Sequence, residues 1–207
     1  MKKAAKLIRI AVFASGFGSN LEALMQFEKK YGLGGGKIVL VFSDKREAFA
    51  LKRAINNNIN TVCFSPKDYK SRTEYDNAIL EMLKIEKIDL IVLAGYMLLL
   101  GKNIITVYRN RILNIHPALL PSFKGTHGIK DAYDYGVKIT GVTVHFVDED
   151  LDSGPIVMQE AVKIEQEDTM EKLESKIHLV EHRIYPLAVK SFCQGKLKIE
   201  GRKVIVL

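Results

Sequence analysis

Two polar side chains that could do chemistry stand two residues apart at the end of an apolar stretch. Asn114 and His116 close the run Ile112–His116, and Pro117 follows at once. Residues two apart in a strand point to the same face, so we expect both side chains together at the carboxyl end of this strand. An amide donor beside an imidazole that can be cationic suits the stabilisation of a developing oxyanion. A core histidine satisfied by hydrogen bonds is the alternative interpretation.

A glycine-rich segment, Ala14–Asn20, joins the first predicted strand to the first helix. Gly16 and Gly18 let backbone amides approach an anion, and a helix N-terminus favours negative charge. A dinucleotide loop would need a third glycine where Leu21 stands, and a Walker loop would need Gly-Lys-Ser/Thr, which is absent from this segment. We therefore predict a site for a single phosphate, with a plain strand-to-helix turn as the alternative.

An acidic segment, Asp148–Pro155, separates two later apolar stretches. Asp148, Asp150 and Asp152 alternate as in a calcium loop, but the glycine falls one place late and Gln159 stands where the distal glutamate belongs. A carboxylate of this segment could instead lie beside His116 and raise its pKa by favouring the imidazolium. An acidic surface turn is the remaining interpretation.

The other histidines carry weaker signals. His178 and His182 lie one helical turn apart and spell His-x-x-Glu-His with Glu181, an inverted zinc-protease order. So short a pattern arises readily by chance and no third ligand is evident, so no metal site is expected. His145 lies in an alternating stretch, where either a structural hydrogen bond or a substrate contact fits.

The first half of the chain alternates strand and helix signals. Continuous apolar strands separated by helices predict a parallel sheet covered on both faces, which is a Rossmann-like α/β fold. Asn20 is the expected N-cap of the first helix. The expected strands are 9–14, 37–42, 61–64, 90–93 and 112–116, and the expected helices are 20–30, 48–57 and 71–86.

The second half predicts an antiparallel portion. The stretches 140–147 and 156–164 alternate apolar and polar residues, as paired strands do. A long helix over 169–194 follows, with Pro186 expected to kink or break it. Short strands at 196–199 and 203–206 end the chain. We expect a single domain over 1–207, with the chemistry in loops at the carboxyl ends of the parallel strands.

Composition sets the broad class. The chain has 207 residues, 47% hydrophobic and 27% charged, as in a globular protein. Its net charge of +7 suits anionic ligands, but basic residues alternate with acidic ones, so no nucleic-acid partner is expected. The apolar run 90–100 is too short for a membrane span. Residues 1–14 resemble a signal peptide, yet a core strand and a cytoplasmic location are the better interpretation, with Cys63 and Cys193 buried.

These segments together resemble the phosphoribosylglycinamide formyltransferases, a branch of the folate-dependent formyltransferase superfamily. The similarity runs in order through nearly the whole chain. Asn-x-His-Pro-x-Leu-Leu-Pro marks the superfamily, and the Gly-Ser-Asn loop is more specific to this branch. The motifs that carry the resemblance are 15–20, 41–44, 93–97, 113–121, 144–147, 151–155 and 181–186.

The resemblance implies transfer of the formyl group of 10-formyltetrahydrofolate to the amine of 5'-phosphoribosylglycinamide, in de novo purine biosynthesis. It implies small-molecule substrates, no metal, no nucleic acid, no membrane, and a monomer or homodimer. The implied catalytic residues are Asn114, His116 and Asp152, and the implied ribonucleotide site is Gly18, Ser19, Asn20 and Glu181. The implied folate pocket is Arg72, Met97, Leu98, Leu99, Leu100, Asn114, Asp148, Glu149, Asp150 and Leu151.

The sequence departs from the family at two positions, and other functions were weighed. His178 stands where a glutamine is expected near the phosphate, and the stretch 97–100 lacks an arginine often found there. A methionyl-tRNA formyltransferase would carry an RNA-binding C-terminal domain, and a formyltetrahydrofolate hydrolase an N-terminal regulatory domain; neither is expected here. A non-catalytic nucleotide-binding module would leave Asn114, His116 and Asp152 unexplained together.

Overall fold

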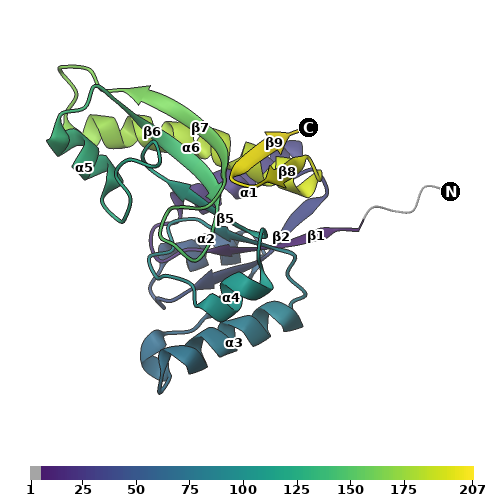
Figure 1. The fold of residues 1–207 in the computed structure, drawn as a ribbon. Coiled ribbons are helices and arrows are strands. Elements are labelled where there is room, and N and C mark those ends of the chain that lie inside the picture. The colour runs from purple at the N-terminus through teal and green to yellow at the C-terminus, as the bar shows by residue number, and fades with distance from the viewer. Residues whose placement is uncertain (1–5) are drawn as a thin grey trace.

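The computed structural model describes residues 6–207, which form one nine-stranded sheet with surrounding helices (Figure 1). The strand order is β3-β2-β1-β4-β5-β6-β7-β9-β8; the first five are parallel to one another and β6 is antiparallel to β5 and β7. This confirms the predicted α/β class with an antiparallel C-terminal portion. The strands are β1 Ile8–Phe13, β2 Gly36–Ser43, β3 Asn60–Cys63, β4 Leu90–Leu93, β5 Ile112–His116, β6 Ile139–Phe146, β7 Ile156–Lys163, β8 Leu197–Glu200 and β9 Lys203–Val206.

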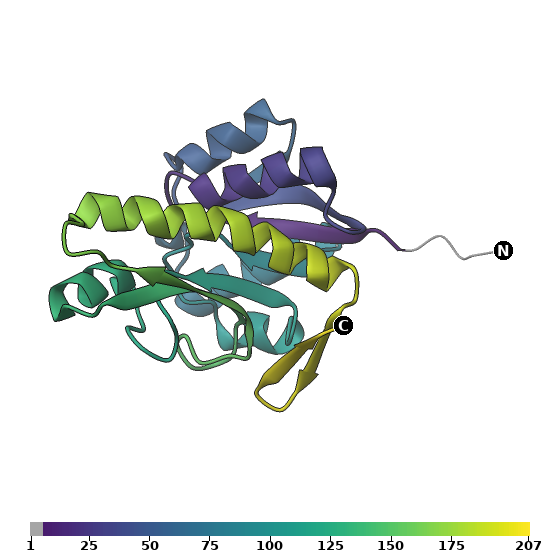
Figure 2. The ribbon, with the colours of Figure 1, turned by 90° about the horizontal axis from the view of Figure 1, so that it is seen from above.

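Helices cover both faces of the sheet. Helices α1, α2 and α6 share a core with one face, and α3 and α4 pack on the other. Figure 2 shows α1 and α6 running side by side. The sequence did not predict the two short helices α4 and α5. The helices are α1 Ser19–Tyr31, α2 Phe49–Asn56, α3 Arg72–Ile85, α4 Lys102–Val107, α5 Gly128–Tyr135 and α6 Met170–Cys193, with a 3-10 turn at Pro66–Asp68.

Strand β1 shows why the central strands are apolar throughout. Its residues alternate between the two cores: Ile10 and Val12 face α1, α2 and α6, whereas Ala11 and Phe13 face α3 and α4. All four are fully buried. Because both faces are covered, polar side chains enter this region only at strand ends, where the candidate site lies.

Pro186 lies within α6 and does not break the helix, so a break there was a wrong prediction. A helix-interior proline removes one hydrogen bond and costs about 3 kcal/mol in isolation. Pro186 is buried with Tyr185, whose hydroxyl lies 2.8 Å from the carbonyl oxygen of Leu93 and 3.0 Å from that of Leu113. Packing of Tyr185 against β4 and β5 therefore holds the helix across the proline.

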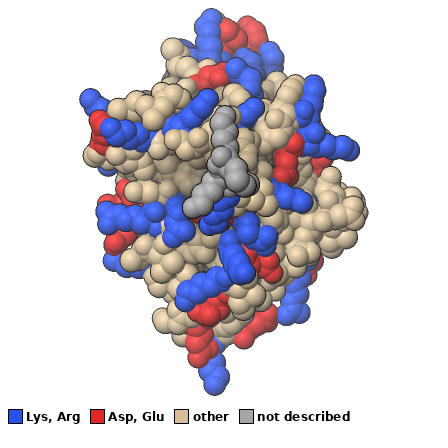
Figure 3. Space-filling view, turned by 90° about the vertical axis from the view of Figure 1, so that its right-hand side faces the viewer, with Lys and Arg blue, Asp and Glu red and all other residues tan. Residues whose placement is uncertain are grey.

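The surface and the N-terminal segment complete the description. The apolar part of 1–14 forms β1, as predicted; residues 1–5 lie outside the described residues. No helix within 6–207 is long and apolar enough to cross a membrane. On the side shown in Figure 3, basic side chains are interspersed with acidic and uncharged ones. Cys63 and Cys193 are half-buried free thiols, less buried than predicted.

Candidate active site

One cavity of about 890 Å³ brings most of the predicted site residues together at the carboxyl edge of the parallel strands. Open parallel sheets bind their ligands at this edge. The loops after β1, β4 and β5 line it, as do the β6–β7 loop and one face of α6. Of the predicted site residues, Arg72 alone does not line the cavity. The predicted residues that line it are Gly18, Ser19, Asn20, Met97, Leu98, Leu99, Leu100, Asn114, His116, Asp148, Glu149, Asp150, Leu151, Asp152 and Glu181.

Asn114, His116 and Asp152 meet, and His145 joins them. Asp152 lies between the two rings: its Oδ2 is 3.5 Å from His116 Nδ1, and its Oδ1 is 3.6 Å from His145 Nε2. Asn114 Nδ2 is 3.2 Å from the same His145 nitrogen. The side chains of His116, His145 and Asp152 are almost inaccessible to solvent, whereas Asn114 is partly exposed. The predicted trio is therefore a group of four.

Hydrogen bonds to backbone carbonyls set the tautomers of both rings. His145 Nδ1 is 2.8 Å from the carbonyl oxygen of Phe146, and His116 Nε2 is 2.7 Å from that of Phe123. A carbonyl only accepts, so each of these nitrogens carries a proton. In the neutral rings the opposite nitrogens are then bare: His145 Nε2 accepts from Asn114, and His116 Nδ1 faces the Asp152 carboxylate.

Asp152 reaches this group by an indirect path. Because β6 is antiparallel to β5, the β6–β7 loop begins beside the start of β5, where the Val147 amide donates to Ile112. The loop then folds back so that Asp152 meets His116 at the other end of that strand. Asp152 has a φ of 47°, a left-handed conformation that aspartate tolerates, and its Oδ2 accepts from the Gly125 amide at 2.9 Å.

Burial and partner charges oppose each other here. Burial lowers the pKa of His116 below its ordinary value, although Asp152 and the Phe123 carbonyl act to raise it. Asp152 therefore acts in the predicted direction, but burial outweighs it, which favours the neutral form of His116 at neutral pH. Burial would raise the pKa of Asp152, but the contact with His145, the hydrogen bond from the Gly125 amide and the nearby His116 bring it below its usual range. The resting pair is a carboxylate facing a neutral imidazole.

The glycine loop and the start of α1 form the second part of the cavity. Gly18, with φ 76°, precedes the helix as its N-cap, so the prediction of Asn20 as N-cap was wrong. Asn20 lies in the first turn, buried, and its Nδ2 donates to Glu181 Oε2 at 3.1 Å. Its Oδ1 has no hydrogen-bond partner among the described residues. Leu21, where a dinucleotide loop would have glycine, is a core side chain.

Glu181 ties α6 to this end of the cavity. Its Oε2 also accepts from His178 Nδ1 at 2.9 Å, and this contact raises the pKa of His178. His178 and His182 are stacked, with ring centroids 6.1 Å apart, and His178 lines the cavity. Within residues 6–207 no three His, Cys, Asp or Glu side chains are grouped to hold a metal ion.

The third part of the cavity is apolar and partly open. Met97, Leu99 and Leu151 are each more than half exposed. The Met97 amide donates to Ser15 Oγ at 2.9 Å, which joins the loop after β4 to the glycine loop. Arg72 supports this wall from behind, where it donates to the Leu99 carbonyl and pairs with Asp76 at 2.8 Å.

Comparison with known proteins decides the family. The formyl transferase family model matches residues 8–189. The chain belongs to the formyl transferase family. It is 42% identical over 182 residues to the phosphoribosylglycinamide formyltransferase of Bacillus subtilis (strain 168), covering 88% of this chain and 93% of that protein. It is 41% identical over 192 residues to the trifunctional purine biosynthetic protein adenosine-3 of Gallus gallus, covering 93% of this chain but 19% of that protein.

A solved structure gives the same result for the fold. The formyltransferase resembles glycinamide ribonucleotide transformylase 1 from Symbiobacterium toebii with a TM-score of 0.95 and 42% identity, covering 100% of this chain and 97% of that one. The full coverage includes the β8–β9 hairpin, which follows the segment matched by the family model.

Sequence reasoning missed several residues that line the cavity of this formyltransferase. Lys45 and Lys102 lie at its edge as exposed cations, and Gly125 and Thr126 come from the loop after β5. His145 was left open between a structural and a substrate role. Its pairing with Asn114 across β5 and β6 depends on strand register, which no local pattern indicates.

Proposed function

We propose that this chain transfers the formyl group of 10-formyltetrahydrofolate to the amine of 5'-phosphoribosylglycinamide, giving the N-formyl product and tetrahydrofolate. The observation that carries the proposal is the continuity of one cavity. It joins the anion-favouring start of α1, the group Asn114–His116–His145–Asp152 and an apolar wall. A phosphorylated amine can enter at one end and a folate ring at the other, with the formyl carbon between them.

The proposed reaction includes the transfer of one proton. The amine attacks the formyl carbon, the carbon–nitrogen bond to folate breaks, and the proton lost by the amine ends on the folate nitrogen. Asn114 supplies an amide donor for the oxyanion that forms on the way. His116 Nδ1 is free to take a proton in its neutral form, and Asp152 at 3.5 Å stabilises the imidazolium that results.

We assign the two substrates to opposite ends of the cavity. Gly18, Ser19, Asn20 and Glu181 lie where a helix N-terminus favours the phosphate and a buried carboxylate suits the amine. Met97–Leu100 and Asp148–Leu151 form the wall we assign to the folate. Arg72 would act on that wall through Leu99, since it does not line the cavity.

The test follows formyl loss from 10-formyltetrahydrofolate with and without glycinamide ribonucleotide. We expect turnover only when both are present, and we expect His116→Ala to lower it about 10²–10⁴-fold without unfolding the protein. Formyl release that needs no ribonucleotide would indicate a hydrolase instead. Binding of ribonucleotide without any turnover would indicate a nucleotide-binding module.

The remaining assignments are part of the same proposal. We infer that 1–207 acts as one formyltransferase domain, because a single continuous sheet and the helices packed on it carry the site. We also propose a cytoplasmic monomer or homodimer. Sedimentation at several protein concentrations distinguishes these two states.

A further inference from the structure

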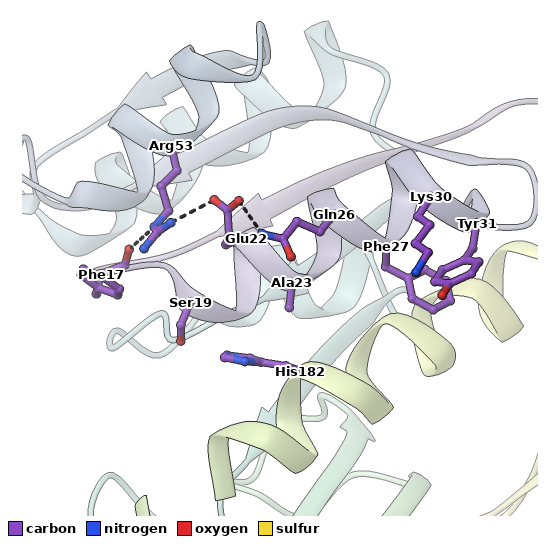
Figure 4. Close-up of a pocket in the computed structure, with 10 residues that line it drawn as sticks. All are labelled: Phe17, Ser19, Glu22, Ala23, Gln26, Phe27, Lys30, Tyr31, Arg53 and His182. Atoms are coloured by element: carbon purple, nitrogen blue, oxygen red, sulfur yellow. Dashed lines mark hydrogen bonds and ion pairs between the residues drawn. The ribbon is translucent and has the colours of Figure 1, made fainter. Parts of the chain in front are cut away.

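Arg53, which lies outside the substrate cavity, contacts the glycine loop from α2. Its Nε donates to the Phe17 carbonyl at 3.0 Å, and its Nη1 pairs with Glu22 at 3.0 Å on the first turn of α1. Figure 4 shows the guanidinium between the two, with Gln26 in turn donating to Glu22 at 3.0 Å. One side chain of α2 thus joins the loop to the helix that follows it.

Two aromatic rings shield this guanidinium. Phe17 and Phe49 are stacked with centroids 5.3 Å apart, and Arg53 lies 4.5 Å from the first ring and 4.9 Å from the second. Both distances are within the range of cation–π attraction. The Arg53 side chain lies at the protein surface, yet only 19% of it is exposed to solvent. Its position is therefore defined by five contacts: one carbonyl, one carboxylate, two rings and its own helix.

The contacts of α2 determine which way the loop amides point. The Gly16 carbonyl accepts from the Ala50 amide at 3.1 Å, and the Phe17 carbonyl accepts from Arg53. In a planar trans peptide the N–H points opposite to the C=O. With both carbonyls facing α2, the amides of Phe17 and Gly18 face away from it. Neither amide donates to any residue of the described chain.

Successive free amides of this kind form an anion-binding concavity, and here they lead into the first turn of α1. Phe17, Gly18 and Ser19 all line the substrate cavity. We infer that Arg53 is a positioning residue for the phosphate of the substrate: it holds the Phe17–Gly18 peptide so that its amide faces the anion. The inference rests on the proposed function for the identity of that phosphate.

A second cavity, of about 520 Å³, lies on the other side of the first turn of α1 and shares only Phe17 and Ser19 with the substrate cavity. Arg53 and Glu22 line this second cavity (Figure 4). Arg53 therefore touches the reverse side of the peptide that faces the phosphate, and it acts without touching the substrate itself.

The test compares Arg53→Gln with Arg46→Gln by calorimetric titration with ribose 5-phosphate. Arg46 precedes the same helix and pairs with Asp68 at 2.9 Å, and within residues 6–207 it makes no hydrogen bond or ion pair with the loop. The two variants lose the same charge. We expect Arg53→Gln to bind ribose 5-phosphate about tenfold more weakly, as for loss of one charge-assisted hydrogen bond, and Arg46→Gln to bind as wild type does. Arg53→Lys keeps the charge but not the forked geometry, so we expect part of the affinity to return.

Turnover separates positioning from general stability. In Arg53→Gln we expect the KM for the ribonucleotide to rise while the KM for the folate and kcat stay close to wild type. Equal affinities in the two glutamine variants would overturn the inference, as would an equal rise in both KM values. If Arg53→Gln does not fold, Arg53→Lys decides by the same measurements. Ribose 5-phosphate needs neither folate nor turnover, so this titration tests Arg53 separately from the proposed reaction.

Discussion

Asp152 Oδ2 lies 3.5 Å from His116 Nδ1, the nitrogen left bare when His116 Nε2 donates to the Phe123 carbonyl. A carboxylate facing a bare nitrogen gains little at rest, but it gains a hydrogen bond and an ion pair as soon as that nitrogen takes a proton. The pair therefore favours His116 as a proton acceptor during turnover more than as a standing cation.

The first prediction concerns the charge of Asp152. Asp152 acts to raise the pKa of His116 against the effect of burial, so Asp152→Asn should lower that pKa further. Turnover should fall about 10²–10⁴-fold, because the imidazolium loses its stabilising partner. Measurement of the His116 titration by NMR, alongside kcat, checks both effects. Asp150→Asn is the matched control: the same loop loses the same charge, and the His116 titration should not change.

The second prediction assigns Asn20 to the ribonucleotide. Its Nδ2 is 3.1 Å from Glu181 Oε2, and its Oδ1 is buried without a partner among residues 6–207. Asn20→Leu removes both polar atoms, so we expect the KM for the ribonucleotide to rise about tenfold or more, as for loss of a hydrogen bond to a charged group. The KM for the folate should change little. A rise confined to the folate KM would mean that the two ends of the cavity are assigned the wrong way round.

Glycines of the loop give the third prediction. Gly18 has φ 76°, and a Cβ there would lie 2.8 Å from the Ala50 Cβ, so Gly18→Ala is both strained and crowded. We expect a loss of about 1–2 kcal/mol in the free energy of unfolding and a higher KM for the ribonucleotide. Gly16 has open space where its Cβ would lie and no positive φ, so Gly16→Ala should leave the free energy of unfolding close to wild type. Urea unfolding of the two variants makes the comparison.

Local patterns predicted most of the fold. Apolar runs gave the five parallel strands within two residues at each end, because burial on both faces leaves a continuous signal, and alternation gave β6 and β7 as closely. The short helices α4 and α5 were not predicted, because six to eight residues show too little of the helical periodicity. Strand β6 was predicted to alternate, yet seven of its eight residues are buried, since the sequence does not say what covers its second face.

The site was less predictable than the fold. Asn114 and His116 could be placed by strand periodicity alone. Asp152 came from the resemblance, because its contact depends on a loop that folds back along β5. Asn20 was taken for an N-cap by residue type, whereas tertiary contact with Glu181 buries it inside the first turn. Contacts between distant segments decide such cases, and the sequence shows neither the distance nor the register.

The last prediction concerns His178, which stands where the resemblance led us to expect a glutamine. Its Nδ1 lies 2.9 Å from Glu181 Oε2, and this hydrogen bond raises the pKa of His178 above its ordinary 6.5. A histidine whose pKa is raised by folding stabilises the folded state fully below its unfolded pKa, and that contribution is lost as pH rises through the folded pKa.

In His178→Gln the imidazolium is absent. The free energy of unfolding should therefore be lower than wild type at pH 5.5, and the difference should shrink as the pH rises above 6.5. The size should be modest, because the His178 side chain is 49% exposed and solvent screens the pair. His182→Gln is the control with the opposite sign: burial lowers the pKa of His182, so the pH-dependent part of its difference from wild type should favour the variant at low pH and fade as the pH rises. Urea unfolding of the three proteins across this pH range tests the prediction. A difference in the free energy of unfolding between wild type and His178→Gln that stays constant with pH would show that the pair with Glu181 does not depend on the charge of the ring.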